Sequence, residues 1–365
     1  MTDLFDYIKW RGDLTFRQDP PNAVDALVFS ALSYIHYSGE LESSFRARVP
    51  LQKAAADFLE LKDCSARIRV KRDIELLKAA ADSVRFGNCI LTRYMERSVP
   101  ERETQFAAVC FFLDDGSAFL AFRGTDDTLI GWKEDFNMSF QDSVPAQRLA
   151  LGYLKAFADD FLVPLRLGGH SKGGNLAVFA AAGVSEDIQK RILSVYNNDG
   201  PGFTEKMIRD PGYIRIVPKI KTFVPQSSVI GMLLEHEEPY IVVRSNQVSL
   251  LQHEIYSWEI IGKKFVEMEE ITVDSRFLNL TIKNWISDMT LEERNVLVDA
   301  MFDLLASGDV DSALDIFQLK NIRHYLKALS ENGNMRKLFS DELRALVAAA
   351  RKAKQEFDLI SKMET

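Results

Sequence analysis

A chain of 365 residues, 47% of them hydrophobic, is long enough for one large core or for one core with an added module. The formal net charge is -8 and no basic run carries interleaved aromatic residues, which excludes an obvious nucleic-acid partner. No apolar run approaches the roughly 18 residues that span a bilayer, and the start lacks the order of a signal peptide. The three cysteines form no CxxC pair, which favours a reducing compartment. We therefore expect a cytoplasmic protein with no transmembrane segment.

The first hundred residues are predicted to be mainly helical, and strand-like patterns follow them. Apolar residues recur at helical spacing over 24–37 and again over 74–86. Two strand-like runs come next, over 106–113 and 118–124, separated by Asp-Asp-Gly. A pair of apolar runs around such a turn predicts a β-hairpin.

Beyond the hairpin, predicted helices and strands alternate. Helices are expected over 152–161 and 174–184, and strands over 163–169, 192–198, 219–225 and 240–246. Apolar strands that alternate with helices are typical of a sheet covered on both faces. The sequence therefore predicts an α/β fold with a mostly parallel central sheet flanked by helices.

The C-terminal part is predicted to be a separate helical extension. Thr290 with Glu293 three residues later is a capping-box pattern, and the helix it opens closes at Gly308. A further amphipathic helix is expected over 340–357. We expect an α/β domain over 1–281 and a helical extension over 282–365. Within the first, a helical N-terminal part is expected over 1–100 and the sheet over 101–265. The extension either packs on the sheet domain or binds a protein partner.

The stretch LGGHSKGGNLAVFAA, residues 167–181, carries the strongest functional signal. Gly169 to Gly173 matches G-x-S-x-G, with an apolar strand before it and a helix of small residues after it. That is the setting of a nucleophile elbow, in which a sharp turn lifts the Ser171 hydroxyl above the sheet. Glycines are needed there because the strand and the helix pass very close to each other. A plain structural turn is the alternative interpretation.

A nucleophilic serine needs a general base, and five histidines are available. His253 follows the strand predicted over 240–246, which is the place of the base in the chain order serine, acid, histidine. His170 lies inside the elbow, so its ring is expected to point aside. His36 lies in an early helix and His324 in the helical extension. His236 precedes the last predicted strand and is expected in a lid or loop.

The acid is harder to place from sequence. Chain order expects it after the strand over 219–225, but QSSVIG follows there without a carboxylate. Asp199 ends the strand before that one, in VYNNDGPGF, and is our predicted acid. Its alternative role is an Asp-Gly turn residue that bonds its own backbone. Weaker acid candidates are Glu235, Glu237 and Glu254.

An oxyanion hole is expected from two backbone N–H groups. Lys172 follows the serine and supplies one; Thr125, after the strand end AFRG, supplies the other. The long Lys172 side chain either favours an anionic substrate or points to solvent, and we expect the second. Arg123 and Asp135 are expected to form an ion pair beneath the loop.

The segments FRGT, Trp132 with Asp135, and GHSKGGNLA together resemble the class 3 (fungal-type) lipases. DYIKWRGDLTF, VPQSSVIGMLLEH and QHEIYSW look like a bacterial branch of lipase-like α/β-hydrolases, over roughly residues 1–265. The resemblance implies the α/β-hydrolase fold, Ser171 as nucleophile, His253 as base, and Thr125 with Lys172 as oxyanion donors. It departs at the acid, because class 3 lipases carry an Asp-x-Val-Pro-like segment where this chain has Pro-Gln-Ser-Ser.

The sequence thus predicts a serine hydrolase of carboxylic esters with a Ser171–His253–Asp199 triad. The expected substrate is a small-molecule acyl ester or a lipid, and no cofactor or metal is needed for this chemistry. Acyl transfer to an acceptor other than water would use the same residues. The segment 226–239 is either an apolar lid or plain core. The rival interpretation is a catalytically impaired scaffold whose helical extension binds a protein partner, and the missing acid after 219–225 supports it.

Overall fold

A computed structural model describes the chain in several ranges. They are residues 2–99, 104–125, 133–134, 137–138, 141, 143–308 and 319–363. Contacts divide these residues into two compact units. The first comprises Met1–Gly124 and Pro145–Ile271, and the second comprises Thr125–Val144 and Thr272–Thr365.

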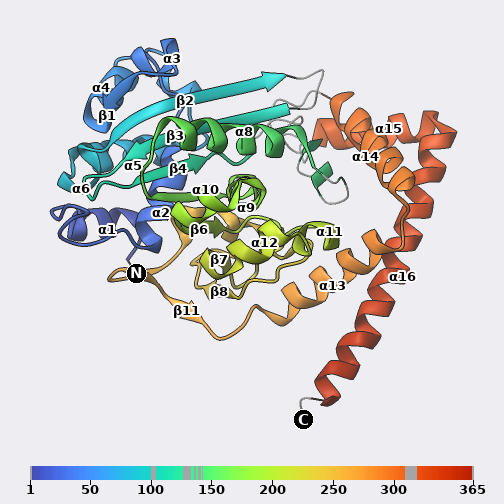
Figure 1. Cartoon of the computed structure of the whole chain (residues 1–365). Helices are drawn as coiled ribbons and strands as arrows, with labels where there is room; N and C mark the ends of the chain where they lie inside the picture. The colour runs from blue at the N-terminus through green and yellow to red at the C-terminus, as the bar shows by residue number, and fades with distance from the viewer. Residues whose placement is uncertain are drawn as a thin grey trace. The chain divides into compact units, whose positions relative to one another are not determined.

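One mixed sheet forms the centre of the first unit (Figure 1). Its strands, in spatial order, are β1 (Arg48–Pro50), β2 (Ile90–Val99), β3 (Thr104–Phe112), β4 (Ala118–Phe122), β5 (Leu165–His170), β6 (Ile192–Asn198), β7 (Ile220–Pro225), β8 (Tyr240–Val243) and β11 (Glu267–Met268). Strands β4 to β8 are parallel neighbours, whereas β1 to β4 pair antiparallel and β11 pairs antiparallel with β8. The carboxyl ends of the parallel strands therefore meet at one edge, where α/β sheets bind ligands.

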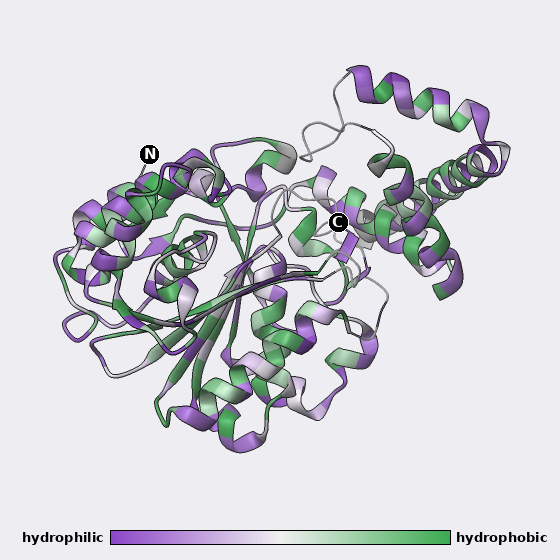
Figure 2. Ribbon diagram, turned by 90° about the horizontal axis from the view of Figure 1, so that it is seen from above, coloured by the Kyte–Doolittle hydropathy of each residue, from purple (hydrophilic) through white to green (hydrophobic). Residues whose placement is uncertain are grey.

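Helices cover both faces of this sheet, and alternation along the strands explains how. Phe111 of β3 and Phe119 of β4 point to one face and pack on Phe29 of helix α2 (Ala23–Leu32), with ring centroids 4.8 and 4.9 Å apart. Phe122 of β4 lies three residues from Phe119, so it faces the other side and meets Tyr153 of α8 (Pro145–Asp160). Figure 2 shows hydrophobic residues, in green, along the strands of the sheet and on the helices that cover it.

The remaining helices of the first unit are short. They are α1 (Leu4–Arg11), α3 (Glu40–Ser43), α4 (Leu51–Leu59), α5 (Lys71–Asp82), α6 (Val84–Gly87), α9 (Lys172–Gly183), α10 (Glu186–Arg191), α11 (Glu205–Ile208) and α12 (Pro211–Ile216). A two-stranded hairpin, β9 (Ile260–Ile261) with β10 (Lys264–Phe265), turns at Gly262, whose φ of 58° suits glycine. None of the described helices is both long enough and apolar enough to cross a membrane.

The α/β class predicted from the sequence is confirmed, while the sheet itself differs from the expected one. The hairpin over 106–124 forms as β3 and β4, and β6 matches the predicted strand over 192–198. The sheet is mixed rather than mostly parallel, because β1 and β2 extend it on the antiparallel side. The sequence pattern does not predict β2. In its sequence, ILTRYMERSV, polar residues occur at both odd and even positions, so apolar and polar residues do not alternate as in a half-buried strand.

The second unit is helical in its C-terminal part. Its helices there are α13 (Val273–Ser287), α14 (Leu291–Ala306), α15 (Leu319–Glu331) and α16 (Gly333–Met363). Thr290 caps α14, and its capping box with Glu293 is present as predicted. Trp285 Nε1 donates to Glu342 Oε2 at 3.2 Å, which joins α13 to α16. The units divide at Ile271, and the predicted domain boundary after residue 281 stays a prediction.

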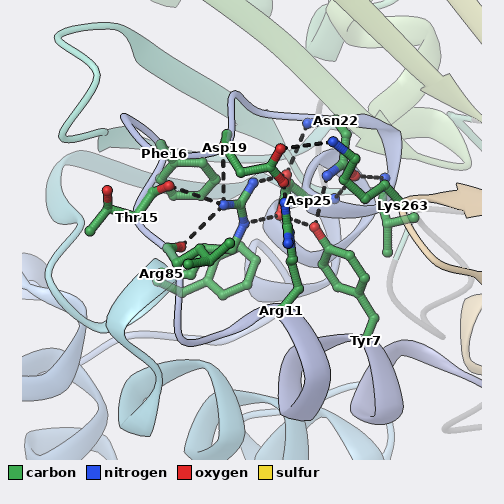
Figure 3. A network of polar contacts seen from close by, with 12 residues as sticks. Tyr7, Arg11, Thr15, Phe16, Asp19, Asn22, Asp25, Arg85 and Lys263 are labelled. Carbon is green, nitrogen blue, oxygen red and sulfur yellow. Dashed lines mark hydrogen bonds and ion pairs between the residues drawn. The ribbon is translucent and has the colours of Figure 1, made fainter.

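A buried ion pair ties the N-terminal helices together (Figure 3). Arg85 forms two hydrogen bonds with the Asp25 carboxylate, at 2.7 and 2.6 Å, and both side chains are fully buried. The Tyr7 hydroxyl donates to Asp25 at 2.8 Å, and Arg85 lies over the Phe16 ring. Arg85 Nη1 also donates to the Asp19 carbonyl at 3.1 Å. Every strong donor and acceptor of this pair is therefore engaged.

We expect Arg85→Met to lower the free energy of unfolding by about 3–5 kcal/mol, because it leaves the Asp25 carboxylate buried without its cation. Urea unfolding followed by circular dichroism measures the change. Lys190→Met is the matched control, since its ion pairs are exposed and their loss should leave the midpoint unchanged. Equal midpoints for Arg85→Met and the wild-type chain would contradict the prediction.

Candidate active site

Ser171 lies on a strained turn between β5 and α9. Its φ of 57° and ψ of -132° fall where residues with a side chain rarely occur. Its backbone N–H donates to the Asn198 carbonyl at 2.9 Å, and its own carbonyl accepts from Gly174 at 2.9 Å. The turn is therefore held at the carboxyl ends of β5 and β6, and the Ser171 residue is 8% exposed.

The glycines of the motif are required by close backbone contacts. A Cβ on Gly169 would lie 2.2 Å from the Gly173 carbonyl carbon, and a Cβ on Gly173 would lie 2.1 Å from the Phe122 oxygen. Both distances are far below a permitted contact. The strand, the turn and the helix thus approach each other as a nucleophile elbow requires.

The structure brings Asp199 and His253 together. His253 Nδ1 donates to Asp199 Oδ2 at 2.6 Å, although the two residues lie 54 positions apart. Asp199 is 1% exposed, whereas the His253 side chain is 28% exposed. Asp199 has a φ of 53°, a conformation that aspartate tolerates better than most residues, and its N–H donates to the Phe223 carbonyl. It therefore sits at the end of β6 beside the end of β7.

The second oxygen of Asp199 is held by the segment after β7. Ser228 Oγ donates to Asp199 Oδ1 at 2.5 Å, and the same hydroxyl accepts from the Gly231 N–H at 3.1 Å. A Cβ on Gly231 would lie 2.2 Å from Asp199 Oδ1, so only glycine leaves room for the carboxylate. Sequence reasoning missed Ser228 and Gly231. Their only signal was the hydroxyl-rich QSSVIG stretch at the place where the acid was expected.

The His253 ring lies beside the ring of His170, the residue that precedes Ser171. The centroids of the two rings are 4.4 Å apart. Among the described residues, no hydrogen bond joins Ser171 Oγ to His253 Nε2. Bonds between a nucleophile and its base are commonly long before substrate binds.

His170 is not available as a base. Its Nδ1 accepts from the Tyr34 hydroxyl at 3.0 Å and its Nε2 donates to the His253 carbonyl at 2.9 Å. The residue is 2% exposed, and burial, followed by the nearby His253 and Arg69, holds its pKa well below the ordinary value. The ring is therefore neutral and bridges the elbow and the His253 loop.

The other histidines have their own partners. His236 Nδ1 contacts the buried Glu238 carboxylate at 3.0 Å, and His36 Nδ1 contacts Glu96 at 2.8 Å. His324 on α15 contacts Ser307 at 3.1 Å. None of these partners belongs to the Asp199–His253 pair.

Of the weaker acid candidates, Glu254 is bonded elsewhere. Its carboxylate pairs with Arg69, and the contact overcomes the effect of burial to hold the pKa of Glu254 below its ordinary value. Glu235 forms backbone bonds with Phe203. Glu237 is exposed. Asp199 is thus the carboxylate that contacts His253.

Lys172 opens α9, so its N–H belongs to the first turn of the helix, which favours negative charge. The expectation that its side chain points to solvent is wrong, because Lys172 is only 1% exposed. Thr125 begins the second compact unit, and its role as the other oxyanion donor stays a prediction.

The expected Arg123–Asp135 pair cannot be followed, since Asp135 and Trp132 lie outside the described residues. Arg123 instead donates to Glu96 Oε1 at 2.8 Å, and a cavity of about 800 Å³ opens beside Glu96 and His36. That volume is in the range of small-molecule sites. In the described parts of the chain, no group of three or more His, Cys, Asp or Glu side chains could hold a metal ion.

We expect Ser171→Gly to be more stable than Ser171→Ala by about 1 kcal/mol, because glycine relieves the strain of a positive φ and alanine keeps it. At an ordinary helix or strand position the order is the reverse. Thermal and urea unfolding of the two variants side by side measure the difference. An alanine variant as stable as the glycine variant would show that the turn is relaxed.

Two solved structures resemble this chain at low similarity. One is the Rhizomucor miehei lipase in its propeptide complex, at 13% identity and a TM-score of 0.36, with 52% of this chain and 72% of that chain covered. The other is the M37 lipase, at 15% identity and a TM-score of 0.36, with 57% of this chain and 68% of that chain covered. A search of curated proteins found no match. The Mbeg1-like family model matches residues 80–303, which is more than half of the chain. The chain therefore belongs to the Mbeg1-like family.

Proposed function

We propose that this protein is a serine hydrolase of the lipase or esterase type, which cleaves carboxylic esters through an acyl-enzyme. The observation that carries the proposal is the 2.6 Å bond between His253 Nδ1 and Asp199 Oδ2, at the same sheet edge as the strained Ser171 turn. A carboxylate that fixes a histidine tautomer beside an elbow serine is the arrangement that activates a hydroxyl. The lipase-like character of the Mbeg1-like family is in keeping with it.

The three residues divide the work of the proposed reaction. Ser171 Oγ attacks the acyl carbon while His253 Nε2 takes its proton. Asp199 keeps the Nδ1 proton of His253 in place and stabilises the imidazolium. The imidazolium then gives its proton to the leaving alcohol. Water attacks the acyl carbon while His253 takes a proton from it, and the C–Oγ bond breaks as His253 returns that proton to Ser171, which releases the carboxylic acid.

The developing oxyanion needs hydrogen-bond donors. We assign this role to the backbone N–H groups of Lys172 and Thr125, the first at the N-terminus of α9, where the helix dipole favours negative charge. The neutral, buried His170 adds no positive charge beside the nucleophile. The substrate class that fits these parts is a small-molecule acyl ester or a lipid.

The scaffold alternative loses its main argument in this arrangement. It depended on the absence of an acid after β7, and the bond between Asp199 and His253 supports Asp199, at the end of β6, as the acid instead. The missing Ser171–His253 bond is the remaining observation in its favour. A probe that reacts only with an activated serine separates the two functions.

We expect a fluorophosphonate probe to label Ser171 in the wild-type chain and to leave Ser171→Ala and His253→Ala unlabelled. Asp199→Asn should slow labelling by about 10³–10⁴-fold, because the histidine loses its tautomer and orientation. Mass spectrometry of the labelled peptide and its time course give the site and the rate. Asp187→Asn is the matched control, since the Asp187 side chain is 93% exposed. A folded wild-type chain that stays unlabelled, with and without detergent, would support the scaffold.

Ser228→Ala is expected to slow the same labelling about tenfold, because the Asp199 carboxylate loses one of its two side-chain partners. Ser194→Ala is the control: it removes a buried hydroxyl further back on β6 and should keep the wild-type rate. Equal rates for the two serine variants would contradict a role for Ser228 in holding Asp199.

A further inference from the structure

Arg69 reaches the loop that carries His253. Its Nη1 and Nη2 atoms donate to the two Glu254 oxygens at 2.6 and 2.8 Å, a bidentate pair next to the proposed base in sequence. The Arg69 side chain is 13% exposed and that of Glu254 is 32% exposed. Arg69 precedes α5 and lies outside the 80–303 span that the family model matches.

A second connection runs from the same arginine to His253 itself. The Arg69 guanidinium lies over the Tyr34 ring, 4.8 Å from its centroid. Tyr34 donates to His170 Nδ1, and His170 Nε2 donates to the His253 carbonyl. Arg69 is therefore joined to both residues at the turn, to Glu254 directly and to His253 through two rings.

The loop before His253 is also held by Gln252, which is 4% exposed and whose Oε1 accepts from the Ser227 N–H at 2.8 Å. It is built of two 3-10 turns, Ser249–His253 and Ile255–Ser257, rather than of a strand. Val248 and Leu251 are 70% and 62% exposed, so they add little packing. After His253, Tyr256 is fixed by its hydroxyl bond to Asp73 at 2.7 Å.

We propose that Arg69 is a positioning residue for the base His253, and that the segment before residue 80 is part of the catalytic apparatus. The inference rests on the proposed serine hydrolase function. The bidentate pair fixes the Glu254 end of the turn, and the Tyr34–His170 bridge fixes the His253 carbonyl. With both ends fixed, the imidazole stays on Asp199.

The test compares Arg69→Met, Glu254→Gln and the double variant with the wild-type chain. Two quantities are measured: the rate of fluorophosphonate labelling at Ser171 and hydrogen–deuterium exchange of the peptide that contains residues 248–257. Each single variant should label about 10- to 100-fold more slowly, because a small misplacement of a catalytic group is costly. The double variant should be no slower than Arg69→Met, since that variant already removes the pair that Glu254→Gln weakens.

Arg166→Met is the matched control. Arg166 pairs with Asp115 at 3.2 Å with 12% and 17% of the side chains exposed, and it lies at the opposite end of β5 from His170. It should keep the wild-type labelling rate and the wild-type exchange of the 248–257 peptide. Arg69→Lys covers the case in which the methionine variant misfolds, because lysine keeps the positive charge but cannot form the bidentate pair. Its labelling rate should lie between those of the wild-type chain and Arg69→Met.

The outcomes separate this inference from the proposed function. Slower labelling together with faster exchange confined to the 248–257 peptide supports the positioning role. Labelling of the folded Arg69 variants at the wild-type rate overturns it while the hydrolase proposal stands, and so does unchanged exchange of that peptide. A wild-type chain that is not labelled at Ser171 overturns the proposed function, and the positioning role fails with it.

Discussion

The close approach of three backbone segments at the end of β5 is the constraint on which the site depends. Gly169 and Gly173 leave no room for a side chain, and Ser171 between them takes a backbone conformation that costs free energy. The surrounding core has to supply that energy. It does so with a sheet covered on both faces, in which α2 is buried along nearly its whole length and α9 packs on the parallel strands.

The N-terminal region contributes more than cover for the sheet. Its interior holds a fully buried arginine whose charge is matched by Asp25 and by backbone carbonyls. A buried pair of this kind adds little net stability but strongly disfavours any packing that separates its members. The same region supplies Tyr34 and Arg69, which contact the elbow and the loop after β8. In the proposed mechanism, the N-terminal region therefore helps to hold the loop of His253 in place.

The position of Asp199, the proposed acid, shows that order along the chain and order in space can differ. β6 and β7 are parallel neighbours, so their carboxyl ends lie side by side at the sheet edge. A carboxylate that leaves from β6 can therefore occupy the place where one from β7 is expected. The β7 end then has a different task, and Ser228 with Gly231 holds the carboxylate from the other side.

The sequence by itself determined the α/β class, the elbow and most of the strands near it, because hydrophobic periodicity and glycine spacing are local signals. It also singled out Ser171, His253 and Asp199, since strand ends can be read along the chain. It did not determine β2, the burial of Lys172, or the partners of Asp199, His170 and Glu254. The side-chain contacts among these join residues that lie far apart in the chain. Asp199 and Ser228 are 29 positions apart, and Arg69 and Glu254 are 185 apart. Only the tertiary structure decides them, because which side chains meet across a sheet edge depends on strand order and packing rather than on local pattern.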